Sequence, residues 1–129
     1  VIDRRVSARR SIFNRYEKAL SQISGFTFMQ EADYGKSNRW LSTLTVDNKV
    51  SGISRNKIID ALDKENIESR PVWKPMHMQP LYKNCIYVKS DYRDISAELF
   101  TNGLCLPSGS SLSKKDQDRI IDIIFSLLN

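Results

Sequence analysis

The spacing of apolar residues predicts a helix at the start of the chain. Intervals of three, four and seven residues recur among the apolar positions Val6, Ile12, Phe13, Tyr16, Ala19, Leu20 and Ile23. This is the pattern of a helix with one buried face. No glycine or proline interrupts the chain before Gly25. We therefore expect a helix over residues 1–24, although no residue near position 1 provides a capping signal.

Two further helices are predicted by capping residues that precede apolar runs. Ser113 can cap a C-terminal helix, with Asp116 at the reciprocal position three residues later. The apolar face of that helix consists of Ile120, Ile121, Ile124, Leu127 and Leu128. Ser54 can cap a central helix, and Ile53 and Ile58 are placed to form a hydrophobic staple across its start. One or two helical turns are also expected over residues 96–101.

Short segments rich in β-branched and aromatic residues predict strands. They are residues 26–29, 39–47, 67–73, 85–88 and 104–107. The combination predicts an α+β fold, a two-layer arrangement in which a small, mostly antiparallel sheet packs against about three helices. With neither repeats nor a low-complexity linker, we expect residues 1–129 to form a single domain.

The composition is that of an ordinary globular protein. Hydrophobic residues make up 40% and charged residues 27% of the chain, and no apolar run reaches the roughly 18 residues that a membrane-spanning helix needs. The N-terminal residues show no secretory signal. Because Cys85 and Cys105 are too few for a disulfide framework, a reduced, cytoplasmic location is expected.

Positive charge is concentrated in the first predicted helix. Residues 1–20 contain six basic and two acidic residues and thus carry +4 of the net charge of +5. Such a helix could follow nucleic-acid phosphates, although its arginines do not fall on one stripe and alternate with Val6 and Ile12. A stand-alone α+β binding module with a basic helix, able to bind nucleic acid, therefore stays open as an alternative function.

The residue types suited to ligand binding gather in "SRPVWKPMHMQP", residues 69–80. This segment holds the single histidine, His77, and three prolines, Pro71, Pro75 and Pro80. Prolines fix φ and make the loop stiff. Donors and flat rings are added by Arg70, Trp73, Lys74 and Tyr82. The combination suits an anionic, ring-containing ligand, and a purely structural histidine is the alternative.

The residues alone indicate no catalytic or metal centre. His77, Cys85 and Cys105 are separated by 8 and 20 residues, which matches no zinc pattern. The serine- and glycine-rich loop before Ser113 could bind phosphate at a helix N-terminus, but a loop with a helix cap is the favoured interpretation. Lys74 is the one lysine in a rigid, partly apolar context, and nothing in the sequence ensures the burial that a Schiff-base lysine usually needs.

Four segments in order resemble the C-terminal part of the DegT-type, pyridoxal phosphate (PLP)-dependent nucleotide-sugar aminotransferases. They are "RRSIFNRYEKAL", "GFTF", "SRPVWKPMHMQPLY" and "GLCLPSGSSLSKKDQDRIIDII". The pattern P-x-H-x-Q-P followed by an aromatic residue, found here over residues 75–82, is similar to the family's C-terminal hallmark. The resemblance implies the small domain of a fold-type-I aminotransferase, with residues 1–24 as a linking helix. The catalytic domain that carries the PLP lysine is absent.

The resemblance also implies a function. The whole enzyme would use PLP to transfer an amino group, commonly from glutamate, to a nucleotide-linked ketosugar in surface-glycan biosynthesis. His77 would donate to the sugar or the diphosphate, with weaker contributions from Arg70, Trp73, Lys74 and Tyr82. Expected partners are the missing N-terminal large domain, a second copy in a homodimer and the nucleotide sugar, with neither a membrane nor nucleic acid. This chain alone would be inactive and would not bind PLP covalently.

A domain separated from its neighbour should expose apolar side chains where the neighbour docks. Phe13 and Tyr16 on the first helix and Trp73 in the loop are the candidates.

Overall fold

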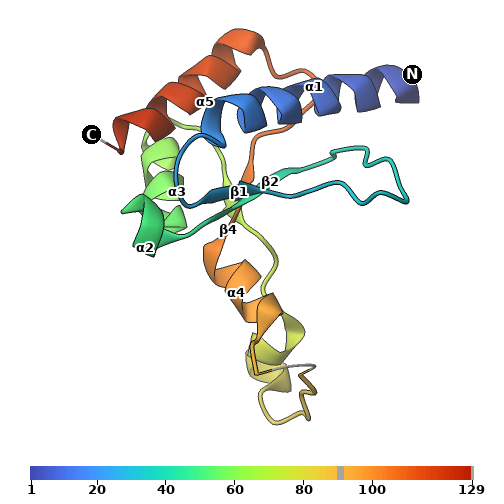
Figure 1. The fold of residues 1–129 in the computed structure, drawn as a ribbon, viewed down its shortest axis with the longest axis vertical. Coiled ribbons are helices and arrows are strands. Elements are labelled where there is room, and N and C mark those ends of the chain that lie inside the picture. Colours follow the sequence, from blue (N-terminus) through green and yellow to red (C-terminus); the bar gives the residue numbers. More distant parts are fainter. Residues whose placement is uncertain (90–91, 129) are drawn as a thin grey trace.

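A four-stranded antiparallel sheet lies at the centre of the computed structural model, which describes residues 1–89 and 92–128 (Figure 1). The strands are β1 (Phe26–Phe28), β2 (Ser42–Val46), β3 (Arg70–Pro71) and β4 (Gly103–Leu106). Their order in the sheet is β1-β2-β4-β3, and every neighbouring pair is antiparallel. The predicted α+β class and antiparallel sheet are confirmed.

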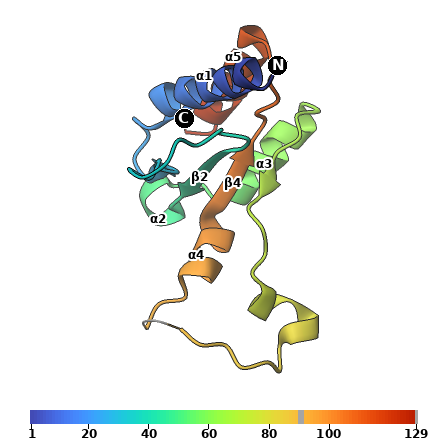
Figure 2. The same ribbon diagram turned by 90° about the vertical axis from the view of Figure 1, so that its right-hand side faces the viewer.

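In the described residues, five α-helices and two short 3₁₀ turns accompany the sheet. The helices are α1 (Ile2–Leu20), α2 (Asn48–Ser51), α3 (Arg55–Lys64), α4 (Ile95–Asn102) and α5 (Lys114–Ser126), and the turns are η1 (Met76–Met78) and η2 (Pro80–Tyr82). α1 and α3 both pack against α5. These three helices supply the helical part of the core, as the sequence predicts, while α4 and the residues that follow β3 extend away from them (Figures 1 and 2).

Alternation along the strands places the core on one face of the sheet. In β2, Ser42, Leu44 and Val46 are buried, whereas Thr43 and Thr45 are only partly buried. The register aligns Leu44 with Phe28 of β1 and with Leu104 of β4, so apolar side chains from three strands share the face beneath the helices. The threonines lie on the opposite face.

Both predicted capping serines are used. The Ser54 hydroxyl accepts a hydrogen bond from the Lys57 backbone N–H at 3.2 Å at the start of α3. At α5, the Ser113 hydroxyl accepts from the Asp116 N–H at 3.1 Å and donates to its carboxylate at 2.6 Å. These bonds satisfy N–H groups that the helix itself leaves free.

The structure corrects the predicted end of the first helix and one predicted strand. The first helix ends at Leu20 rather than at residue 24, because the Ile23 N–H bonds to the Leu20 carbonyl in a tight turn that directs the Ile23 side chain into the core. Residues 85–88 form no strand. They lie outside the sheet, and the side chains of Ile86 and Val88 are exposed.

The prediction of an exposed apolar surface on the first helix is wrong for Phe13 and Tyr16. Both side chains are fully buried. The Phe13 ring meets the Phe28 ring edge to face at a centroid distance of 5.6 Å, and the Tyr16 hydroxyl donates to the Pro107 carbonyl at 3.1 Å. The face of α1 that carries them is turned toward the sheet. Trp73 is exposed as predicted, with 65% of its surface accessible.

The helices of the described residues give no sign of a membrane span, since none of them is both long and apolar enough to cross a bilayer.

Candidate functional site

The segment around His77 that follows β3, here called the histidine loop, contains the two 3₁₀ turns η1 and η2. Pro75 and Pro80 open the two turns. The Pro75 carbonyl accepts from the Met78 N–H at 3.1 Å, and the Gln79 carbonyl accepts from the Tyr82 N–H at 3.0 Å. Since a proline lacks an N–H and has a preset φ, it suits the first position of such a turn. The backbone around His77 is therefore closely defined.

The His77 ring is held between an aromatic ring and a carboxylate. It stacks on Tyr87 with ring centroids 3.8 Å apart and an interplanar angle of 9°. Its Nε2 atom lies 2.9 Å from Asp94 Oδ2, and 19% of the side chain remains exposed. Nε2 is buried and makes no hydrogen bond of regular geometry with the described residues. The contact is thus a short electrostatic approach rather than a linear hydrogen bond.

Asp94 connects the histidine loop to the start of α4. Its Oδ1 atom accepts three hydrogen bonds, each 3.0 Å long, from the Ala97 N–H, the Ser96 hydroxyl and the Tyr87 hydroxyl. The bond from the Ala97 N–H makes the largest contribution to lowering the pKa of Asp94 to about 2, and the Ser96 and Tyr87 hydroxyls and the nearby His77 lower it further. The side chain is therefore a carboxylate at neutral pH.

The other predicted site residues do not join His77 in one cluster. Arg70, the first residue of β3, pairs with Glu68, and the Lys74 side chain is exposed. Tyr82 is half-buried in η2. In the parts of the chain that the structure describes, no hydrogen bond, ion pair or ring contact links any two of the five predicted residues. Tyr87 and Asp94, which do contact His77, were not singled out in the sequence.

Trp73 instead belongs to a cleft on the open face of the sheet. The cleft has a volume of about 510 Å³. Trp73 stacks on Trp40 with centroids 5.9 Å apart, and Leu99 of α4 contributes to the lining. Thr27, Thr43 and Thr45 of the sheet also line the cleft. The start of α4 lies near His77, through Asp94, and its end lies near the cleft, through Gly103. α4 has 8 residues, so the two ends are separated by roughly 12 Å at a helical rise of ~1.5 Å per residue.

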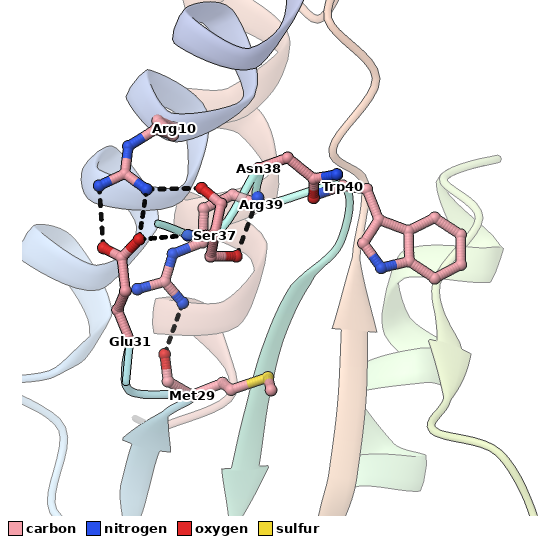
Figure 3. A network of polar contacts seen from close by, with 7 residues as sticks. All are labelled: Arg10, Met29, Glu31, Ser37, Asn38, Arg39 and Trp40. Atoms are coloured by element: carbon pink, nitrogen blue, oxygen red, sulfur yellow. Dashed lines mark hydrogen bonds and ion pairs between the residues drawn. The ribbon is translucent and has the colours of Figure 1, made fainter. Parts of the chain in front are cut away.

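A polar network holds the β1–β2 connection that carries Trp40 (Figure 3). The Arg10 guanidinium donates to both oxygens of Glu31, at 2.7 and 2.9 Å, and to the Ser37 carbonyl at 2.5 Å. Glu31 also accepts from the Ser37 N–H. The hydrogen bonds from Arg10, followed by that from the Ser37 backbone, lower the pKa of Glu31 to about 2. Arg39, two residues beyond Ser37, donates to the Met29 carbonyl at 2.7 Å and closes the base of the connection.

Most of the arginine side chains of α1 form hydrogen bonds or ion pairs with other segments of the chain. Four of its arginines reach other segments, namely Arg5 to Ser110, Arg9 to the Trp40 carbonyl, Arg10 to Glu31 and Arg15 to Asp118. These contacts tie α1 to the β1–β2 connection, to the loop before α5 and to α5 itself. They give the local charge a structural role and weigh against the nucleic-acid alternative.

The comparisons with known proteins identify the family. The model of the DegT/DnrJ/EryC1/StrS aminotransferase family matches residues 1–125, and the chain belongs to this family.

Three relatives show how far the similarity extends. The chain is 45% identical over 130 residues to EpsN of Bacillus subtilis (strain 168), whose assignment as a pyridoxal phosphate-dependent aminotransferase is itself provisional. It is 30% identical over 128 residues to the GDP-perosamine synthase of Caulobacter vibrioides. Among solved structures, a DegT DnrJ EryC1 StrS aminotransferase from Brucella abortus superimposes with a TM-score of 0.79 at 27% identity.

These matches include most or all of this chain but only part of each relative. They cover 100%, 98% and 97% of the chain, and 33%, 33% and 31% of the relatives in the same order. The chain thus spans about a third of the length of the proteins that it resembles.

The residues of this chain do not fit covalent attachment of PLP. A lysine that forms a Schiff base is usually desolvated, because burial lowers its pKa toward neutrality. All ten lysines of this chain are exposed, Lys74 included.

Proposed function

We propose that this chain is the small domain of a longer PLP-dependent aminotransferase that acts on a nucleotide-linked ketosugar. PLP supplies the electron sink for amino-group transfer in such enzymes, and it would be held by a large domain outside residues 1–129. The contribution of this chain is to position the sugar nucleotide through the histidine loop. The whole enzyme would form a homodimer and serve amino-sugar or surface-glycan biosynthesis, with glutamate as a common amino donor.

The observation that carries this proposal is the setting of His77 within a chain of this family. The ring is held by Tyr87 and Asp94, and its backbone is set by two proline-initiated turns. A group that is already ordered loses little entropy on binding a ligand. A sugar hydroxyl or a diphosphate oxygen is the kind of partner that an imidazole can hydrogen-bond. The relative named as a GDP-perosamine synthase supports a nucleotide sugar as the substrate class.

The test is the variant His77→Ala in the full-length enzyme. A hydrogen bond to a charged partner contributes about 1.5–3 kcal/mol, so kcat/KM for the nucleotide sugar should fall by roughly 10- to 150-fold. The amount of PLP bound should not change. Lys83→Ala is the control, because Lys83 is an exposed residue of the same loop outside the proposed site. Wild-type kinetics for His77→Ala would reject the proposed role.

A second experiment tests whether this chain alone binds PLP covalently. Because its lysines are exposed, mixing the chain with PLP should give no visible absorbance band that survives dialysis. A stoichiometric, dialysis-resistant band that maps to Lys74 would contradict the proposal.

A further inference from the structure

Asp94 has two oxygens with separate tasks. Oδ1 accepts from the Ala97 N–H and from the Ser96 and Tyr87 hydroxyls and so caps α4. Oδ2 faces the His77 ring at 2.9 Å, with Lys89 Nζ further away at 3.9 Å. One side chain therefore joins the start of a helix to the orientation of the imidazole.

The contact with Oδ2 determines which ring nitrogen carries the proton. Nε2 is buried, and the carboxylate oxygen is the charged group it meets. An unprotonated Nε2 would bring its lone pair close to that negative oxygen and be repelled, whereas Nε2–H is attracted even though the contact does not have the geometry of a regular hydrogen bond. The second nitrogen of a neutral imidazole is then an acceptor. The parallel stack on Tyr87 opposes tilting of the ring out of this plane.

We infer that Asp94 is a positioning residue that fixes His77 in the Nε2–H tautomer and leaves Nδ1 to face the substrate. The inference rests on the proposed function, because it is the nucleotide sugar that Nδ1 would meet. The neutral ring accepts a hydrogen bond from a sugar hydroxyl, and only the protonated ring donates to a diphosphate oxygen. Asp94 acts through His77 and does not itself contact the substrate.

The variant Asp94→Asn separates the two tasks of the side chain. Asparagine caps helices as well as aspartate does, so α4 should keep its start. The carboxamide would place its oxygen on the capping N–H and its NH₂ donor toward His77. An NH₂ group facing Nε2 requires a lone pair there, so the proton of the neutral ring should move to Nδ1. Replacing an aspartate beside a catalytic histidine by asparagine has this effect in serine proteases.

The tautomer can be measured directly, because His77 is the single histidine of the chain. The ¹⁵N chemical shifts of the two ring nitrogens, recorded at alkaline pH where imidazole is neutral, distinguish the protonated nitrogen from the unprotonated one. The wild-type chain should show Nε2–H, and Asp94→Asn should show Nδ1–H. Asp47→Asn is the matched control, since Asp47 likewise caps a helix by accepting from a backbone N–H but makes no contact with His77, and it should keep Nε2–H.

Several results would overturn the inference. Nδ1–H in the wild-type chain, or an unchanged tautomer in a folded Asp94→Asn chain, would do so. If Asp94→Asn does not fold, the wild-type tautomer and the variant Tyr87→Phe still decide. Tyr87→Phe keeps the stacking ring and removes only the hydroxyl that donates to Oδ1, so it should keep Nε2–H. Loss of Nε2–H in Tyr87→Phe would contradict the role given to Oδ2.

Kinetics of the full-length enzyme separate this inference from the proposed function. Asp94→Asn should lower kcat/KM within the roughly 10- to 150-fold range expected for His77→Ala. In the His77→Ala background it should have a further effect below about twofold, because coupled residues are not additive. A full additional loss would overturn the inference, since Asp94 would then act independently of His77. A tautomer switch together with wild-type kinetics for His77→Ala would reject the proposed function and still support the control of the tautomer by Asp94.

Discussion

Gly103 occupies a position that has no room for a side chain. It is the first residue of β4, directly after α4. A Cβ atom there would lie 2.3 Å from the Leu99 carbonyl oxygen and 2.6 Å from Val72 Cγ2. Ordinary contact begins at 3.4 Å, so the Leu99 carbonyl would have to move by about 1.1 Å, the difference between these distances. The Leu99 carbonyl oxygen is a backbone atom, which moves less readily than the far end of a flexible side chain.

Gly103→Ala should therefore destabilise the chain by about 1–3 kcal/mol, the usual cost of overpacking. Strain in φ makes no contribution, since φ of Gly103 is −81°. The displacement would also disturb the hydrogen bonds that the Gly103 carbonyl accepts from Val72 N–H and from Arg55, each 3.2 Å long. Urea-induced unfolding followed by circular dichroism gives the free energy of unfolding and shows whether the transition stays two-state.

Gly35→Ala is the matched control for this prediction. Gly35 lies in the β1–β2 connection, and a Cβ atom there would have no neighbour within 4 Å. The substitution should be neutral or stabilise the chain by up to ~1 kcal/mol, because alanine lowers the entropy of the unfolded state. A difference between the two variants below about 0.5 kcal/mol, the size of an ordinary surface effect, would refute the reasoning.

Two further predictions concern polar contacts outside the histidine loop. Ser113→Ala removes the acceptor of the Asp116 N–H at the start of α5 and should lower the free energy of unfolding by about 1 kcal/mol in the same urea assay. The control Ser111→Ala, in the preceding loop, should leave the free energy of unfolding unchanged. Equal losses in the two variants would contradict the capping role. Glu31 has its pKa lowered from 4.5 to about 2, chiefly by Arg10, so it contributes stability above pH 4.5 that is lost as the pH falls toward 2. Urea midpoints across this range should fall less steeply for Glu31→Gln than for the wild-type chain, and parallel curves would show that Glu31 is not the group responsible.

Local signals explain which parts of the fold could be predicted from the sequence. Ser54 and Ser113 identify helix starts through bonds to N–H groups three residues away, so the information is contained in one turn. The strand pattern at Ser42–Val46 alternates between buried and partly buried residues, and alternation is likewise local. In contrast, residues 85–88 have the composition of a strand but no neighbouring strand to pair with. Composition does not reveal whether a partner exists.

The candidate site was only partly accessible to sequence reasoning for a similar reason. His77 could be found because it is the single histidine and lies among prolines. Tyr87 and Asp94 follow it by ten and seventeen residues. No periodic pattern between these positions indicates that the later residues contact the His77 imidazole. Phe13 and Tyr16 were expected at a docking surface because the sequence does not show which side of an apolar helix face meets its own sheet.

The position of Asp94 makes the orientation of His77 depend on the whole of α4. Asp94 caps one end of this helix, and Gly103 at the other end permits its close approach to Val72. Val72 follows β3 directly and lies in the same loop as His77. The loop therefore contacts α4 near His77, through Asp94, and the first residue of β4 at Val72. We expect a shift of the helix at Gly103 to disturb the cap at Asp94 or the chain at Val72, and both adjoin the segment that carries His77. A substitution about one helix length from His77 should therefore change the environment of its imidazole, whereas the core formed by α1, α3 and α5 need not change.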